Sequence, residues 1–239
     1  MLSFYFFHIG DDKDLPEMLV HSLKISNPGC KVYQISDYDS PEVSNVDKCF
    51  RFKGNVSNIM KFRMETYSKI KLEKNIPAIF LDTDMLVFKK LNEKQLFKEN
   101  NFVFCKREID IDNYVNVNYN NLNMVELKNK KIGDVWPYLG CFFAIKDINP
   151  FIEMNNMYDH LDEKYRYWYG DQIVLKQYAI KNKKNITFVG EKEYACAPEA
   201  LFGSDSLDIR QKLKIIHFKG KKFKKLMIKS YNHLINNKI

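Results

Sequence analysis

Apolar runs and amphipathic segments alternate along most of the chain, and they divide it into predicted strands and helices. The apolar runs at 4–9 and 31–35 predict two strands. Between them, a helix beginning near Leu15 would place Leu19 and Leu23 on one buried face. A strand, a helix and a second strand in this order are typical of a parallel sheet, which indicates an α/β fold.

The rest of the chain continues the same pattern of alternating elements. Further apolar runs predict buried strands at 78–88, 102–105, 138–145, 186–189 and 213–218. Helical spacing predicts helices at 56–74, 92–98, 150–165 and 173–181, and the segment 41–54 is expected to be irregular. The sequence has no internal repeat and no evident linker. We therefore predict one domain over residues 1–220, with a mostly parallel central sheet flanked by helices, and a basic helical tail over 221–239.

Composition and cysteine content bound the class of protein. The 239 residues are 45% hydrophobic and 28% charged, which is ordinary for a globular domain. The five cysteines are scattered without the spacing of a metal site, as expected for reduced thiols in a cytosolic protein. No segment has the pattern of a signal peptide or a membrane-spanning helix. We expect a cytoplasmic protein.

The net charge of +8 is concentrated at the C-terminal end. Seven lysines and no acidic residue lie from Lys219 onward, whereas residues 1–218 hold 31 basic and 30 acidic side chains. Because most of the chain is nearly neutral, nucleic acid is not the expected partner, although a nucleic-acid-binding protein acting through its tail is the alternative from another class. Apolar residues recur at helical spacing after Lys221, which fits either an anionic membrane surface, such as the inner membrane face, or packing on the same domain.

Two carboxylates interrupt the predicted strand at 78–88. Asp82 and Asp84 flank Thr83 between two apolar stretches, and buried acids are costly unless a cation meets them. Carboxylate oxygens are preferred ligands of hard divalent cations. A solvated turn is the alternative for this segment, since Asp and Thr are common in turns. In open parallel sheets, ligands bind beyond the carboxyl ends of strands, which is where these residues lie.

Three other features add to this segment. Asp171 and Gln172 follow a glycine at a predicted helix start, where an acidic residue also serves as a cap. His217 leaves an apolar strand just before Gly220, and a lone histidine there is often structural. Arg63 lies on the helix before the Asp-Thr-Asp segment, where an ordinary ion pair is the alternative.

The order of these features resembles the GT-A glycosyltransferases, most closely glycosyltransferase family 8, which includes glycogenin and the bacterial lipopolysaccharide galactosyl- and glucosyltransferases. The resemblance covers about residues 3–225, and the Asp-x-Asp motif with the later His-Phe-x-Gly motif is its most specific part. It implies that Asp82, Asp84 and His217 hold Mn²⁺, or Mg²⁺, against the diphosphate of a nucleotide-sugar donor. Such a metal neutralises the charge of the leaving group without a proton transfer.

The resemblance also implies donor contacts and reacting groups. Asp171 and Gln172 match the Asp-Gln pair that lies beside the transferred sugar. The implied donor contacts are Gly10, Asp11, Arg63, Asp82, Thr83, Asp84, Gly140, Gly220 and Lys222. Two positions depart from the family pattern. Phe223 stands where the family has a diphosphate-binding lysine, so the assignment needs a one-residue shift to the flanking Lys222 or Lys224, and Tyr138 replaces the Asn before the strand glycine.

The predicted activity is transfer of a sugar from a UDP-sugar to a saccharide or glycolipid acceptor, with retention of configuration. An inverting enzyme, and a glycosyltransferase 32-like enzyme, are the alternatives within the class, although residues 75–78 lack the Gly-Gly-Ile-Tyr run usual in the latter. The segment 108–131, with six Asn between 113 and 123, is predicted to be a long loop that acts as a lid or faces the acceptor. Tyr165, Tyr167 and Trp168 either stack on an acceptor sugar or pack in the core.

Overall fold

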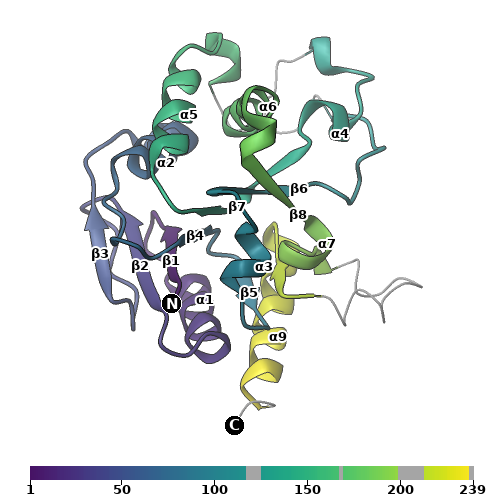
Figure 1. Cartoon of the computed structure of the whole chain (residues 1–239). Coiled ribbons are helices and arrows are strands. Elements are labelled where there is room, and N and C mark those ends of the chain that lie inside the picture. Colours follow the sequence, from purple (N-terminus) through teal and green to yellow (C-terminus); the bar gives the residue numbers. More distant parts are fainter. Residues whose placement is uncertain (117–124, 167–168, 199–212, 237–239) are drawn as a thin grey trace.

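The computed structural model describes residues 1–116, 125–166, 169–198 and 213–236, and it shows the predicted α/β architecture with helices on both faces of a central sheet (Figure 1). The strands are β1 Ser3–Phe7, β2 Lys31–Ser36, β3 Lys48–Arg51, β4 Ala78–Leu81, β5 Met85–Val87, β6 Phe102–Lys106, β7 Tyr138–Ile145, β8 Ile186–Gly190 and β9 Ile215–His217. The longer helices are α1 Asp14–Ser26, α2 Ile59–Lys69, α5 Asn149–Asp159, α6 Gly170–Asn182 and α9 Lys224–Asn236. Short helices are α3 Glu93–Phe97, α4 Ile132–Val135 and α7 Glu191–Tyr194, with single 3₁₀ turns at Val56–Asn58, Val125–Leu127, Glu163–Tyr165, Lys183–Asn185 and Lys221–Phe223.

The central sheet has seven strands in the order β3-β2-β1-β4-β7-β6-β8. All neighbouring pairs are parallel except those made by β7, which runs antiparallel to both β4 and β6. The sheet is therefore mostly parallel, as predicted. The carboxyl ends of β1, β4 and β6 point to the same edge, because only β7 is reversed among the strands between them.

Both faces of the sheet are buried, which explains the continuous apolar runs of its strands. In β1, Phe4 and Phe6 face one hydrophobic cluster together with Leu19 of α1, whereas Tyr5 faces another. The second cluster packs against α2, α5 and α6, which lie together on the opposite side of the sheet from α1 (Figure 1). Alternate residues of one strand thus pack into two different hydrophobic clusters.

A second, two-stranded sheet pairs β5 with β9 in antiparallel orientation. The segment 78–88 is therefore not one strand, as the sequence suggested, but β4 and β5 in different sheets. The polar residues 82–84 form a turn between them, which lets the chain leave the central sheet. Apolar residues on both sides of the turn hid this break in the sequence.

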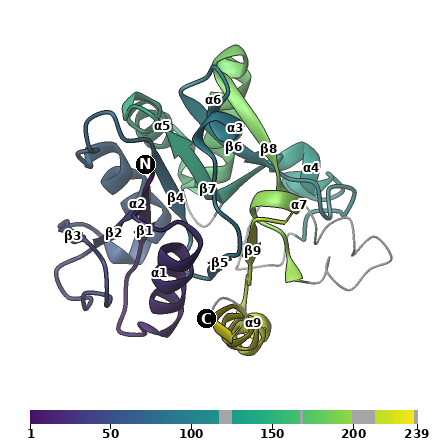
Figure 2. The same cartoon turned by 60° about the horizontal axis from the view of Figure 1, so that its bottom comes forward.

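The basic tail folds as helix α9 against α1 and β5, and Figure 2 shows α1 and α9 beside each other. Met227 and Leu234 are buried, and Met227 belongs to a hydrophobic cluster with Met18 and Leu86. His21 of α1 bonds to the Tyr231 hydroxyl at 2.6 Å. The apolar spacing of the tail is thus explained by packing on its own domain. Among the described residues, no helix is long and apolar enough to cross a membrane.

Three other boundaries differ from the sequence-based prediction. The segment 41–54 contains β3, a short edge strand with partly exposed side chains that lacks a clear apolar pattern. Helix α2 ends at Lys69, before the predicted 74, because Ile70 is extended and buried in the core. Helix α5 ends at Asp159, short of the predicted 165.

Candidate active site

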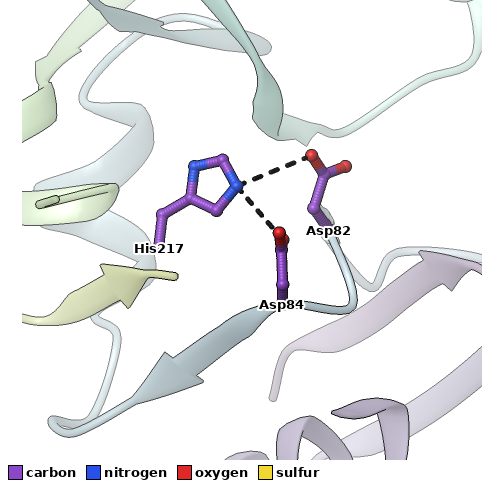
Figure 3. A group of neighbouring side chains, drawn as sticks. All are labelled: Asp82, Asp84 and His217. Atoms are coloured by element: carbon purple, nitrogen blue, oxygen red, sulfur yellow. Dashed lines mark ion pairs between the residues drawn. The ribbon is translucent and has the colours of Figure 1, made fainter. Parts of the chain in front are cut away.

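The turn between the two sheets carries Asp82 and Asp84 and is fixed to β9 by strand pairing. Met85 lies opposite His217 in the β5–β9 register, and the Phe218 N–H donates to the Asp84 carbonyl oxygen at 2.8 Å. The imidazole of His217 is therefore held beside both carboxylates, although it comes from far along the chain (Figure 3). The structure brings together the three residues that the resemblance implied as metal ligands.

The three side chains of this Asp-Asp-His cluster lie close together. His217 Nε2 lies 3.1 Å from Asp84 Oδ1 and 4.0 Å from Asp82 Oδ2. The side chains of Asp82 and Asp84 remain 30% and 27% exposed, so ligand can reach them. Burial lowers the pKa of His217, but the neighbouring Cys141 and Asp84 side chains outweigh it and raise that pKa well above its usual range. Burial and the nearby Asp84 raise the pKa of Asp82, despite the opposing charge of Arg63.

The donor set of this cluster fits a divalent cation. One ligand atom from each of the three residues lies within 4.8 Å of the others, and this is the one cluster of three or more such residues in the part of the chain that the structure describes. Two carboxylate oxygens with one imidazole nitrogen form a mixed oxygen and nitrogen set that suits first-row divalent metals. The ligand types and spacing of this cluster are therefore compatible with such an ion.

Arg63 connects this cluster to the other wall of the site. It lies on α2, which begins after Asn58, whose side chain accepts a hydrogen bond from the Lys61 N–H. The Arg63 side chain is 10% exposed; Nη1 donates to Asp82 Oδ1 at 3.0 Å, and Nη2 donates to Asp171 Oδ2. A guanidinium presents its donors in a rigid fork, so one side chain sets the spacing of two carboxylates.

Gly140 on β7 makes room for this ion pair. A Cβ at this position would lie 2.6 Å from Asp171 Oδ2 and 3.1 Å from Arg63 Nη2. The contact with Asp171 is closer than a Cβ tolerates, the contact with Arg63 is tight, and both partners are buried. The glycine that the sequence singled out therefore permits the close approach of β7 to Arg63 and Asp171.

The first turn of α6 holds Asp171 and Gln172. Asp171 is 3% exposed, and its Oδ1 accepts the Gln172 N–H at 2.7 Å while Oδ2 accepts from Arg63. Gln172 Oε1 accepts from Arg107 Nη2 at 3.0 Å. Arg107 follows β6 and was not identified from the sequence. A lone arginine after a strand has no local signature, and only its place at the carboxyl end of β6 could have pointed to it.

These residues line one cavity of about 390 Å³. Its lining is formed by Phe7, Leu15, Ile59, Met60, Arg63, Asp82, Thr83, Asp84, Arg107, Leu139, Gly140, Cys141, Asp171, Gln172, His217, Lys219 and Gly220. Gly220 has φ of 93°, a left-handed conformation that favours glycine, in the turn after β9. The cavity combines both acidic and basic groups at the carboxyl-end edge of the sheet.

Other residues singled out in the sequence lie elsewhere. Gly10, whose N–H donates to Ser40 Oγ at 2.8 Å, and Asp11 are not among the lining residues, and neither is Lys222, whose ammonium lies 4.5 Å from the Phe223 ring centroid. Their role as donor contacts stays a prediction. Tyr165 lines a separate cavity of about 600 Å³. Residues 117–124 of the predicted lid or acceptor-facing loop, together with Tyr167 and Trp168, lie outside the described residues.

Comparison with known proteins supports the fold. No protein-family model matches the sequence, and no curated protein matches it. A solved structure described as a WbbM bifunctional glycosyltransferase in its apo form matches with a TM-score of 0.53 and 14% sequence identity. The match covers 92% of this chain and 46% of that chain, so this chain spans about half the length of that protein. The chain shares the Rossmann-like α/β fold of that structure, with a mostly parallel sheet flanked by helices.

Proposed function

We propose that the protein is a metal-dependent glycosyltransferase that moves a sugar from a UDP-sugar to a saccharide or glycolipid acceptor. The observation that carries this proposal is the Asp82–Asp84–His217 cluster on one wall of a cavity whose other wall holds Asp171 and Gln172. The cavity lies at the carboxyl ends of strands in a fold shared with a glycosyltransferase. Sugar transfer from a nucleotide donor needs these two elements, a charge-neutralising site and a polar sugar site, side by side.

The residues of the cavity would have different roles in such a reaction. A divalent cation, Mn²⁺ or Mg²⁺, held by Asp82, Asp84 and His217 would stabilise the charge that develops on the diphosphate leaving group. Lys219 and the Gly220 backbone line the same wall and can meet the phosphates. Arg63 keeps Asp82 and Asp171 at a fixed spacing. It thereby positions the sugar wall, which holds Asp171 and Gln172, against the metal wall, which holds the Asp-Asp-His cluster. By its likeness to family 8, we propose that the transfer retains configuration.

A direct test is release of UDP from a panel of UDP-sugars with and without Mn²⁺. We expect Mn²⁺-dependent release with one donor, and a loss of about 100-fold or more in Asp84→Asn, because that variant removes a charged ligand. Asp39→Asn changes an exposed aspartate outside the cavity and should keep full turnover. Turnover that is independent of Mn²⁺, or unchanged in Asp84→Asn, would contradict the proposal. The anomeric configuration of the product, read by NMR, decides between retention and inversion.

We further propose that α9 adsorbs to anionic membranes through its lysines while its apolar side stays packed on the domain. Lys225 and Lys229 are exposed, and Met227 between them is buried against α1 and β5. Each basic group near an anionic surface contributes about 1 kcal/mol of attraction. Deleting the helix would expose the core, so the informative variant is Lys225→Gln with Lys229→Gln.

Sedimentation with anionic liposomes tests this adsorption. We expect the Lys225→Gln and Lys229→Gln double variant to sediment less than the wild-type protein, and added salt to release the wild type. A double variant of the exposed Lys128 and Lys184, each to Gln, is the matched control for net charge. Equal sedimentation of the two double variants would refute a specific role for α9.

A further inference from the structure

The amide group of Gln172 has a fixed orientation in the cavity. Its Oε1 accepts a hydrogen bond from Arg107 Nη2 at 3.0 Å, and the side chain lines the cavity next to Asp171. A guanidinium has donors and no acceptor, so the amide atom that faces Arg107 must be the carbonyl oxygen. Within the described residues, no group accepts a hydrogen bond from Gln172 Nε2. The two hydrogens on Nε2 are therefore the part of the amide left for a ligand.

Arg107 is itself held in place from several sides. Its backbone N–H donates to the Pro137 carbonyl oxygen at 2.8 Å, and its Nε donates to the Trp136 carbonyl oxygen at 2.9 Å. The Trp136 ring stacks on Tyr169, with centroids 4.1 Å apart and planes 17° from parallel. Tyr169 directly precedes α6, the helix that carries Gln172. Both partners of the Arg107–Gln172 hydrogen bond are thus fixed to one local framework.

A buried carboxylate fixes the chain just after Arg107. Glu191 is 7% exposed, and its Oε2 accepts from the backbone N–H groups of Glu108 and Ile109, each at 2.8 Å. These two hydrogen bonds restrain the segment that follows β6 and so keep Arg107 beside Gln172. Because both side chains of this hydrogen bond are already anchored, they lose little conformational entropy when a ligand binds. The site is therefore preorganised.

We propose that Arg107 is a positioning residue that orients Gln172 as a hydrogen-bond donor to an oxygen of the donor sugar, and that Gln172 does not act as nucleophile or base. This proposal rests on the proposed function. Arg107 already donates to the amide oxygen, and each carboxylate oxygen of Asp171 already accepts one hydrogen bond, from Arg63 or from the Gln172 N–H. The hydrogens of Gln172 Nε2 are the unshared donors of this wall, and a hydroxyl or ether oxygen of a sugar can accept them.

Gln172→Glu separates the two possible roles of this side chain. Glutamate keeps an oxygen for Arg107 and gains an ion pair with it, but it has no N–H donors at neutral pH. If Gln172 donates, the variant should release UDP about 10-fold to 100-fold more slowly while its Tm does not fall. If Gln172 attacks or accepts through its oxygen, the more nucleophilic carboxylate should turn over at least as fast.

A double-mutant cycle tests the role of Arg107. Arg107→Met should lower kcat in the wild-type background by about as much as Gln172→Leu does, because each disrupts the same oriented donor. In the Gln172→Leu background, Arg107→Met should change kcat by less than about 2-fold. Equal losses from Arg107→Met in both backgrounds would mean that Arg107 acts independently of Gln172, which overturns the positioning role.

The failure of this inference and the failure of the proposed function are distinguishable. Mn²⁺-dependent release of UDP by the wild-type protein, together with slow release by Gln172→Glu, supports both. Wild-type release with undiminished turnover in Gln172→Glu overturns the donor role of Gln172 and leaves the glycosyltransferase proposal standing. Absence of release by the wild-type protein with every UDP-sugar overturns the glycosyltransferase proposal and the inference that rests on it.

Discussion

The two walls of the cavity differ in how completely their polar groups are bonded to the protein. On one wall, which we call the metal wall, Asp82 and Asp84 keep 30% and 27% of their side chains exposed and share one imidazole. The other wall is the sugar wall, which we call the anchored wall in this comparison. There the side chains of Arg63 and Asp171 are only 10% and 4% exposed and bond directly to each other. The metal wall is thus open to a cation from solvent, whereas the charged pair of the anchored wall is buried and already formed without a ligand.

This difference predicts how stability and function separate within one site. Groups of the anchored wall contribute to the free energy of unfolding, because removing one partner leaves the other buried and unpaired. On the metal wall, burial raises the pKa of Asp82, so its ionised form costs stability when the protein holds no ion. Burial also acts to raise the pKa of Asp84, but the nearby His217 outweighs it and lowers that pKa. Removing the charge of Asp82 and disrupting the Arg63–Asp171 pair should therefore have opposite effects on the stability of the metal-free protein.

The largest loss of stability is expected for Gly140→Ala. Its Cβ would lie 2.6 Å from Asp171 Oδ2 and must push this carboxylate away from Arg63. Breaking a buried ion pair costs about 3 kcal/mol, and turnover should fall with it because Asp171 no longer holds the Gln172 N–H. Urea denaturation and UDP release measure the two effects. Wild-type stability and turnover in this variant would show that the close contact is not needed.

A smaller loss is expected at an acid outside the cavity, Asp47. It accepts from the Val32 N–H at 2.9 Å and pairs with Lys24 and Lys31. Burial acts to raise its pKa, but the hydrogen bonds from Lys24 and Val32 outweigh it and lower the pKa from 3.8 to about 2. Because Asp47 is an exposed residue, solvent screening reduces its contribution to about 1 kcal/mol of stability at neutral pH, which Asp47→Asn should remove.

The pH dependence of this loss follows from the sign of the shift. Because the folded pKa is lower than the unfolded one, the contribution of Asp47 is complete above about pH 5 and disappears as the pH falls through 4 toward 2. The wild type and Asp47→Asn should therefore differ in urea denaturation at pH 7 and converge near pH 2. Turnover should stay unchanged at pH 7, which distinguishes this acid from both walls of the cavity.

The smallest effect on the metal-free protein is expected for Asp82→Asn. Burial raises the pKa of Asp82, so its ionised form destabilises the fold, and the neutral amide should leave the Tm unchanged or raise it. In the wild type, Mn²⁺ should raise the Tm by mass action, and Asp82→Asn should abolish that increase. Thermal denaturation with and without Mn²⁺ measures both. A marked loss of metal-free stability would place Asp82 with the anchored wall.

Much of the architecture could be predicted from the sequence, because both faces of the central sheet are buried. The runs at β1, β2 and β8 and the periodicity of α1 and α6 are strong local signals. The break between β4 and β5 was missed because apolar residues lie on both sides of Asp82–Asp84. The strand β3 was missed because an exposed edge strand has no clear pattern.

The candidate site was predictable only where a motif marked it. The Asp-Thr-Asp segment and His217 are linked through a resemblance, and the β5–β9 register that brings them together is a long-range pairing invisible to local patterns. Arg107 reaches Gln172 across 65 positions of the sequence, so no spacing rule could connect them. Positions such as Gly140 could be named, but the reason for the glycine, a clash with Asp171, needs coordinates.

The central claim is that Asp82, Asp84 and His217 hold a divalent cation that a nucleoside diphosphate requires for binding. Calorimetric titration of UDP in the presence of Mn²⁺ or of EDTA tests it most directly, with Asp84→Asn as the variant and Asp47→Asn as a control outside the cavity. The account predicts that EDTA, or Asp84→Asn, weakens UDP binding at least about 10-fold, while Asp47→Asn binds like the wild type. Equal UDP affinity with Mn²⁺, with EDTA and in Asp84→Asn would contradict the claim.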